Sequence, residues 1–206
     1  MCYLCKDVIR NGFRRKIGSP KSMKIAKPIR YSFGRKMLRK ELDAVRLRKG
    51  YNFNSAQSIG IIYQDIDENF YKAVREYAQF LKSTFEIKTV KALGFVDAPT
   101  KKIPNYQQHS LEFEYFELAD LNWYGKPMRG IESFINEEFH ILLDLSGGSA
   151  LPLNYVLKES RASMKVGVKG TMGERYCDII IDMGQVVGID KFVAQLNQYL
   201  SNSKIR

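Results

Sequence analysis

From residue 58 onward the chain alternates between short apolar runs and longer amphipathic stretches, a pattern typical of strands joined by helices. The run Ser58–Tyr63 is almost continuously apolar, as expected for a strand buried on both faces of a parallel sheet. Further runs of strand character lie at 90–96, 111–115, 139–145, 165–168 and 178–182. The pattern therefore predicts a sheet of about six strands.

The stretches between these strands carry apolar residues at helical spacing. An N-cap is expected at Asp67, ahead of a helix whose apolar face holds Phe70, Val74, Tyr77 and Leu81. Shorter helices are predicted over 131–138 and, after a capping Ser149, through Arg161. A closing helix carries apolar residues over 189–200.

This alternation also predicts the fold class. Strand–helix–strand units need right-handed crossovers, which give a mostly parallel sheet with helices on both faces. We therefore expect residues 51–206 to form an α/β, three-layer Rossmann-like domain. The last two predicted strands are close together in the chain, which favours an antiparallel pair at one edge.

Charge separates the first fifty residues from this domain. Residues 1–50 hold 16 Lys and Arg against three acidic residues, a net +13, whereas 51–206 hold 17 basic and 19 acidic residues, a net −2, and the sum is +11. Gly and Pro over 12–32 indicate an extended linker. Ser32–Lys49 is predicted as a basic amphipathic helix whose apolar stripe is Leu38, Leu42 and Val45. We expect residues 1–50 to form a basic N-terminal arm.

An arm of this charge attracts polyanions. Aromatic residues such as Tyr31 and Phe33 lie among its cations and suit contact with RNA as well as burial at a membrane interface. Nucleic acid or the ribosome and an anionic membrane surface are both candidate partners; alternatively, the helix packs on the domain and its charges only solvate it. The candidate polyanion-binding residues are Arg14, Arg15, Lys16, Arg35, Lys36, Arg39, Lys40, Arg46, Arg48 and Lys49.

Membrane-spanning and secretory signals are missing from the sequence. No apolar run is long enough to cross a bilayer, and the N-terminus lacks the apolar core of a signal peptide. Cys2, Cys5 and Cys177 are too few for a disulfide framework, and the CxxC pair has no second pair of metal ligands. We expect a cytoplasmic protein, either free or peripheral to the inner membrane.

Two stretches are candidate ligand sites. After the strand at 139–145, a glycine pair beside a helix N-terminus suits the phosphate of a nucleotide or sugar phosphate, although it also suits an ordinary tight turn; the residues are Asp144, Ser146, Gly147, Gly148 and Ser149. The loop 121–127 is rich in aromatics: Trp123 and Tyr124 either fold over the sheet edge or stack on a base or sugar. In the second case, Lys126 and Arg129 take an adjacent phosphate.

No residue is assigned to catalysis or to a metal. Neither serine of the 144–149 stretch has a placed base, and the two histidines stand alone, so a binding protein is expected rather than an enzyme and the cofactor is left unassigned.

Several motifs of the chain resemble those of one bacterial family. They are Ile59-Gly60-Ile61, Lys91–Phe95, Asp120–Pro127, Phe134–Phe139, Asp144-Leu145 and Lys165–Gly167. Together they resemble a family of unknown function with a Rossmann-like domain and a basic N-terminal helix, over residues 30–203, which implies a fold and no activity. Ile141–Gly147 and the helix after it are similar to the acceptor half of heptosyltransferase-type glycosyltransferases. Those enzymes bind the donor nucleotide in a second Rossmann domain, for which this chain has no room.

Two functions are therefore hypotheses. The first is a non-enzymatic binding protein whose basic arm docks on nucleic acid, on the ribosome or on an anionic membrane. The alternative is a small enzyme or sensor that holds a nucleotide or phosphorylated sugar at Ser146–Ser149.

Overall fold

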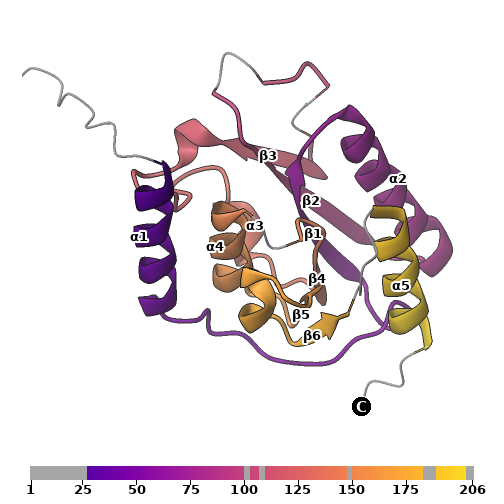
Figure 1. Cartoon of the computed structure of the whole chain (residues 1–206). Coiled ribbons are helices and arrows are strands. Elements are labelled where there is room, and N and C mark those ends of the chain that lie inside the picture. Colours follow the sequence, from indigo (N-terminus) through magenta and orange to yellow (C-terminus); the bar gives the residue numbers. More distant parts are fainter. Residues whose placement is uncertain (1–26, 100–102, 107–109, 148–149, 183–188, 203–206) are drawn as a thin grey trace, which may run out of the picture.

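The central feature of the structure is a six-stranded sheet in which each strand runs parallel to its neighbours (Figure 1). The computed structural model describes residues 27–99, 103–106, 110–147, 150–182 and 189–202. The spatial order of the strands is β3-β2-β1-β4-β5-β6. Their bounds are β1 (Ser58–Asp65), β2 (Thr89–Val96), β3 (Phe113–Glu117), β4 (Ile141–Asp144), β5 (Met164–Val168) and β6 (Ile179–Ile181).

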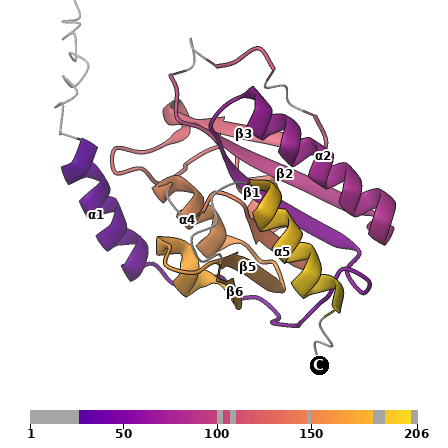
Figure 2. The ribbon, with the colours of Figure 1, turned by 45° about the vertical axis from the view of Figure 1, so that its right-hand side comes forward.

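Helices cover both faces of this sheet. α2 (Glu68–Phe85) and α5 (Ile189–Asn202) lie on one face, and α3 (Glu132–Asn136) and α4 (Leu151–Glu159) lie on the other (Figure 1, Figure 2). Short 3-10 helices are η2 (Leu118–Asp120) and η3 (Met172–Tyr176). The layers confirm the α/β, three-layer Rossmann-like fold expected from the alternation of strands and helices.

Alternate residues of β1 enter two separate cores. Ile59 and Ile61 pack into the core beneath α2 and α5, whereas Ile62 packs into the core beneath α3 and α4. This follows from the two-residue period of a strand, since successive side chains point to opposite faces. A strand buried on both faces needs apolar residues at every position, which is the pattern found in the sequence.

Helix α2 begins and packs as expected. The Asp67 carboxylate accepts the backbone N–H of Phe70 at 2.8 Å, which confirms the N-cap. Val74, Tyr77 and Leu81 are buried against the sheet. The helix ends before Glu86, whose backbone is left-handed with φ of 55°.

The edge strand β6 corrects one prediction. It pairs with β5 in parallel, with Gly167 opposite Ile180, and not antiparallel. The reason lies in residues 169–178, where η3 carries the chain back across the α4 side of the sheet before β6 begins. A parallel pair needs such a return crossover, whereas an antiparallel pair needs only a tight turn.

The N-terminal helix α1 (Lys27–Lys40) also differs from the prediction, which placed a helix over Ser32–Lys49 and an extended linker over 12–32. The helix begins five residues earlier, inside the expected linker, and ends nine residues earlier. Residues 42–57 form neither helix nor strand, and Leu42 and Val45 of the expected apolar stripe are 91% and 96% exposed. Contacts with the domain end the helix. The Lys158 ammonium donates to the carbonyls of Leu38 and Glu41 at 2.8 and 2.6 Å, and so caps its last turn.

Helix α1 packs against α4 from the outside and adds a layer on that side (Figure 1). Leu38 is buried against Leu151 and Tyr155, and the Tyr155 hydroxyl donates to the carbonyl of Gly34 at 2.8 Å. At the other end, the Arg30 guanidinium donates to the carbonyl of Asn122 at 3.0 Å. The helix is therefore held by buried contacts along its length.

We expect Gly34→Ala to destabilise the protein. Alanine is ordinarily better than glycine in a helix interior by about 1 kcal/mol. Here, however, a Cβ would lie 2.2 Å from the carbonyl oxygen of Tyr124 and 2.7 Å from Cδ2 of Leu151. Overpacking of this kind costs about 1–3 kcal/mol, which reverses the sign of the substitution. Urea unfolding measures the difference, with Ser32→Ala on the exposed side of α1 as control; a more stable Gly34→Ala variant contradicts the docking of α1.

Candidate functional site

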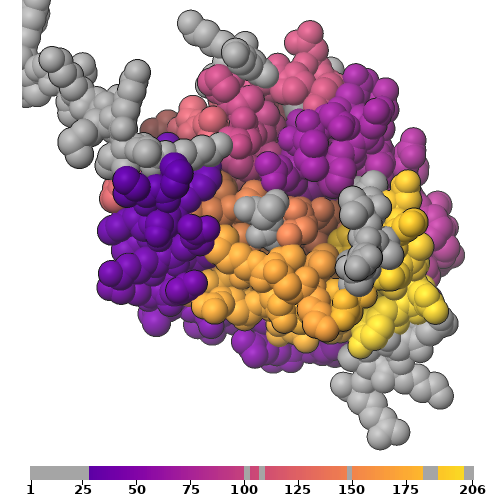
Figure 3. All heavy atoms as spheres, viewed as in Figure 1, coloured from indigo at the N-terminus to yellow at the C-terminus, as the bar shows by residue number. Residues whose placement is uncertain are grey.

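Helix α1 and the extended residues after it form a cationic surface. We call α1, residues 41–49 (the 41–49 segment) and the loop 121–128 the N-terminal face. Figure 3 shows that α1 lies at the surface of the molecule, beside α4. Within the part of the chain that the structure describes, four exposed cations of α1 have no carboxylate at ion-pair distance; they are Arg35, Lys36, Arg39 and Lys40.

The acidic residues of this face are neutralised by one lysine of the loop 121–128 and one of α4. Glu41 lies 3.0 Å from the Lys126 ammonium, which also binds Glu159 at 2.8 Å. Asp43 lies 3.4 Å from the ammonium of the buried Lys158. Both carboxylates of residues 28–49 therefore have a cationic partner, and the cations of α1 dominate the potential of the face.

The 41–49 segment buries a charged side chain and exposes the apolar side chains on either side of it, the reverse of the usual arrangement in an extended segment at a protein surface. Val45 and Leu47 are 96% and 80% exposed, whereas the Arg46 side chain between them is only 6% exposed. The Arg46 guanidinium donates to the carbonyls of Ala162 and Ser163 and to the Asp178 carboxylate, at 3.1, 2.8 and 2.7 Å. Because successive side chains of an extended chain point to opposite sides, burying Arg46 drives its apolar neighbours into water.

A second apolar group lies around the first turns of α1. Phe33 contacts Trp123, with ring centroids 4.8 Å apart, and both side chains are partly open to solvent. Ile29, one turn before Phe33, and Met128 are also exposed. The N-terminal face thus carries exposed apolar groups near both ends of α1 and cations between them.

The aromatic loop 121–127 packs against α1. Tyr124 contacts Phe33 and Tyr155, with ring centroids 5.7 and 6.5 Å apart. The Lys126 ammonium is already held by the carboxylates of Glu41 and Glu159, whereas Arg129 is exposed. Among the residues predicted to bind a base and its phosphate, some therefore already contact other side chains and others are exposed to solvent.

The predicted anion loop is described only in part. Asp144 is buried, and its Oδ1 accepts the backbone N–H of Ser146 at 2.9 Å and also its hydroxyl. Burial raises the pKa of this carboxyl, although the bonds from Ser146 oppose the shift. Gly147 is exposed with φ of +63°, and Gly148 and Ser149 lie outside the described residues. Helix α4 takes its N-cap from Ala150 and not from Ser149, with proline in its first turn.

Other predicted positions fall outside the described residues or on the edge of the face. Arg14, Arg15, Lys16 and the Cys2–Cys5 pair belong to residues 1–26, which the structure does not describe. Arg48 is exposed 3.8 Å from Asp178, and the Lys49 ammonium lies 5.0 Å from the centre of the Tyr51 ring. Within the described ranges, no three His, Cys, Asp or Glu side chains come together as metal ligands do.

Sequence reasoning missed two buried lysines. Lys158 caps α1, and the Lys165 ammonium donates to the carbonyls of Leu157 and Lys158 at 2.6 and 3.2 Å, at the end of α4. Burial, together with the nearby Arg46, lowers the pKa of Lys165 to about 7. A signal did exist, because a lysine inside an apolar strand such as Lys165-Val166-Gly167-Val168 is buried with its charge or marks an exposed edge.

Comparison with known proteins places the chain in a family. Residues 30–202 match the model of a family of unknown function, DUF6913. The chain belongs to this family. The matched range includes most of α1 as well as all six strands. No curated protein and no solved structure matches the chain, so the likeness to heptosyltransferases stays an expectation.

No helix within the described ranges is both long and apolar enough to cross a bilayer.

Proposed function

We propose that this protein is a non-enzymatic binding protein that docks on an anionic membrane surface through its N-terminal face. The reversed orientation of Val45, Arg46 and Leu47 carries the proposal. Large aliphatic side chains in water forgo about 1.5–3 kcal/mol each relative to full burial. Leu42, Val45 and Leu47 are three such side chains within six residues, which favours a partner that covers them.

The chemistry of the exposed apolar residues favours lipid over nucleic acid. Single-stranded nucleic acids are held by aromatic side chains that stack on bases. The most exposed apolar residues of the face are instead aliphatic, namely Leu42, Val45, Leu47 and Ile29. Such side chains suit the boundary between headgroups and acyl chains.

The cations of the face complement the lipid headgroups. Arg35, Lys36, Arg39 and Lys40 have no carboxylate partner among the described residues, and each cation near an anionic leaflet contributes about 1 kcal/mol. Residues 1–26 add seven Lys and Arg and one acidic residue to the same end of the chain. A protein held in this way is peripheral to the cytoplasmic side of the inner membrane.

Binding to vesicles tests the proposal. The full chain is sedimented with vesicles of phosphatidylglycerol and with vesicles of phosphatidylcholine, at low and high salt. We expect binding to phosphatidylglycerol that weakens as salt rises, since salt screens exposed charges. A triple variant, Leu42→Ser, Val45→Ser and Leu47→Ser, should bind at least about tenfold more weakly, a loss of about 1.4 kcal/mol.

Leu111→Ser provides the matched control, because Leu111 is 91% exposed and lies outside the N-terminal face. The control should bind vesicles as the unchanged protein does. Undiminished binding by the triple variant contradicts the proposal. So does tight, salt-dependent binding to single-stranded RNA with none to vesicles, which makes nucleic acid the partner instead.

A further inference from the structure

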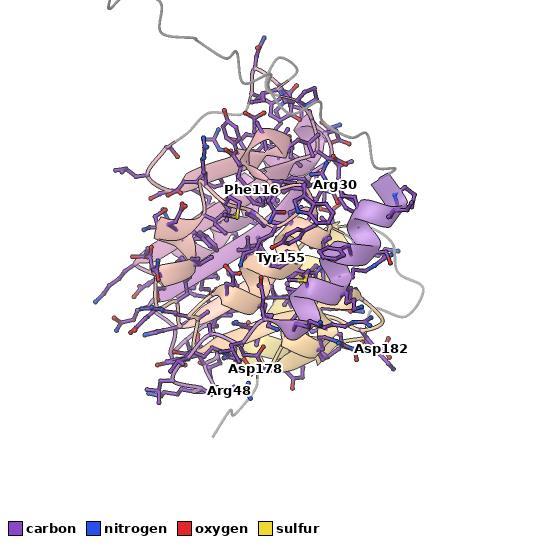
Figure 4. All side chains as sticks on the ribbon, turned by 90° about the vertical axis from the view of Figure 1, so that its left-hand side faces the viewer. Arg30, Arg48, Phe116, Tyr155, Asp178 and Asp182 are labelled. Carbon is purple, nitrogen blue, oxygen red and sulfur yellow. The ribbon has the colours of Figure 1, made fainter. Side chains whose placement is uncertain are left out.

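A small cavity lies beneath the 41–49 segment. Its volume is about 100 Å³, and its walls are that segment, the ends of α4 and η3, the start of β5 and residues 177–178. Figure 4 shows Arg48 and Asp178 together at this end of the molecule, away from Arg30. The charged residues that line it are Asp43, Arg46, Arg48, Lys158, Lys165, Arg175 and Asp178.

The charges around the cavity do not balance. Five of these residues are cations and two are carboxylates. Tyr176 and Cys177 also line the cavity, but burial raises the pKa of both, so the phenol and the thiol stay neutral at pH 7. Arg46 and Lys158 have Asp178 and Asp43 as partners, whereas Lys165 is buried with no carboxylate at ion-pair distance among the described residues. Burying a cation without a matching anion is costly, and a bound anion offsets part of that cost.

Several of the cations keep hydrogen-bond donors for a ligand. In its protonated form Lys165 has three N–H donors, of which two carbonyls occupy two and one is left for the cavity. The Arg46 guanidinium, by contrast, already donates hydrogen bonds to two carbonyls and to the Asp178 carboxylate. Arg175 is exposed at the mouth, and Arg48 has only a 3.8 Å contact with Asp178. Donors therefore converge from β5, from η3 and from the 41–49 segment.

We propose that this cavity binds a phosphate group, with Lys165, Arg48 and Arg175 as its ligands. The volume is about three times the share of one water molecule in the liquid, which accommodates a tetrahedral oxyanion. Guanidinium groups bind phosphate through paired hydrogen bonds, and an anion held beside Lys165 favours the protonated form of that amine, whose pKa burial lowers to about 7.

An adjoining groove extends the site. It has a volume of about 480 Å³, shares Arg175 and Tyr176 with the cavity, and is also lined by Arg35 and Arg39 of α1. Pockets of this volume hold drug-sized molecules. The groove gives room for the rest of a phosphorylated molecule, which is either a soluble phosphomonoester or the headgroup of a phosphomonoester lipid such as phosphatidic acid.

The site does not depend on membrane docking, because its ligands differ from the aliphatic residues that carry that proposal. Isothermal titration with inorganic phosphate, in chloride buffer of matched ionic strength, tests it directly. We expect saturable binding that Lys165→Met and Arg175→Gln each weaken at least about tenfold, since each removes a charge-assisted hydrogen bond. The triple variant Leu42→Ser, Val45→Ser and Leu47→Ser should keep phosphate binding.

Arg175 is exposed, so Arg175→Gln is expected to fold normally and to report on binding alone. Arg129→Gln is the control, because Arg129 is exposed outside the cavity.

Two further titrations distinguish the sources of the phosphate. Binding of glycerol 3-phosphate identifies a soluble ligand, whereas tighter, Lys165-dependent binding to vesicles with phosphatidic acid than with phosphatidylglycerol identifies a lipid. No saturable binding of phosphate, or equal binding by all variants, overturns the proposal.

Discussion

Lys165→Met is expected to stabilise the protein by about 1–4 kcal/mol at pH 7, the range found when buried ion pairs are replaced by apolar groups of similar volume. Lys165 is 2% exposed, and burial together with Arg46 lowers its pKa from 10.5 to about 7. Asp178 and Asp43 act in the opposite direction and do not offset the shift. Charging this amine in the folded state therefore costs free energy that the unfolded chain does not incur.

The sign of the pH dependence follows from these two pKa values. Between pH 7 and 10.5 the unfolded lysine holds a proton that the folded one has lost, so the stability of the unchanged protein rises with pH across this window. Below about pH 7 both states are protonated and the penalty is constant, at most about 5 kcal/mol from the full shift. Methionine forfeits two hydrogen bonds to carbonyls, worth about 1 kcal/mol each, which reduces the net gain.

Urea unfolding between pH 6 and 10, in buffer free of phosphate, measures both quantities. The difference between Lys165→Met and the unchanged protein should be largest at the acid end and shrink toward pH 10. Lys88→Met, at an exposed lysine, is the control and should leave the slope unchanged. Parallel curves for Lys165→Met and the unchanged protein contradict a lowered pKa for Lys165.

Phe53→Ala is expected to cost about 3–5 kcal/mol, the range for truncating a fully buried phenylalanine. Phe53 is completely buried in the core beneath α2 and α5, with its ring 5.0 Å from that of Phe85. Its backbone N–H donates to the carbonyl of Leu200 at 3.2 Å. Phe53 thereby anchors the chain that connects α1 and the 41–49 segment to the sheet.

The unfolding free energy in urea measures this effect, with Asn54→Ala at the exposed neighbouring position as control. The control should lie within about 0.5 kcal/mol of the unchanged protein, as surface substitutions usually do. If Phe53→Ala lowers the unfolding free energy by a similarly small amount, Phe53 does not anchor the chain between the 41–49 segment and the sheet in the core.

The expected behaviour of Lys165 bears on why the residue is a lysine at all. If Lys165→Met is more stable but no longer binds phosphate, the amine lowers the stability of the fold and is needed for binding, as is common for groups in functional sites. If the same variant is more stable and phosphate binding never occurred, the amine serves only to cap α4. Stability and binding therefore have to be measured on the same variants.

The position of α1 gives the N-terminal face a fixed direction. Gly34, Leu38 and Tyr155 hold the helix against α4, so its free cations keep one orientation relative to the sheet. A freely tethered helix presents its charges in any direction. A fixed face instead binds a flat, extended partner with less loss of conformational freedom, which suits a membrane surface.

Much of the fold was predictable from local sequence pattern. The β1 strand, the Asp67 cap and the buried face of α2 all follow from which positions are apolar and from what a short carboxylate does at a helix start. Such signals are local, because side chains a few residues apart decide them. The excess of basic residues before residue 50 is likewise a property of composition alone.

Only the tertiary structure decided where α1 ends, which way β6 runs and where Arg46 points. Lys158, Ala162 and Asp178 lie more than a hundred residues further along the chain than the groups that they bind, so no pattern within the 41–49 segment contains them. Helical periodicity through Leu38, Leu42 and Val45 was real, but hydrogen bonds to these distant partners outweigh it. The cavity around Lys165 has the same origin, because four separate stretches of chain supply its walls.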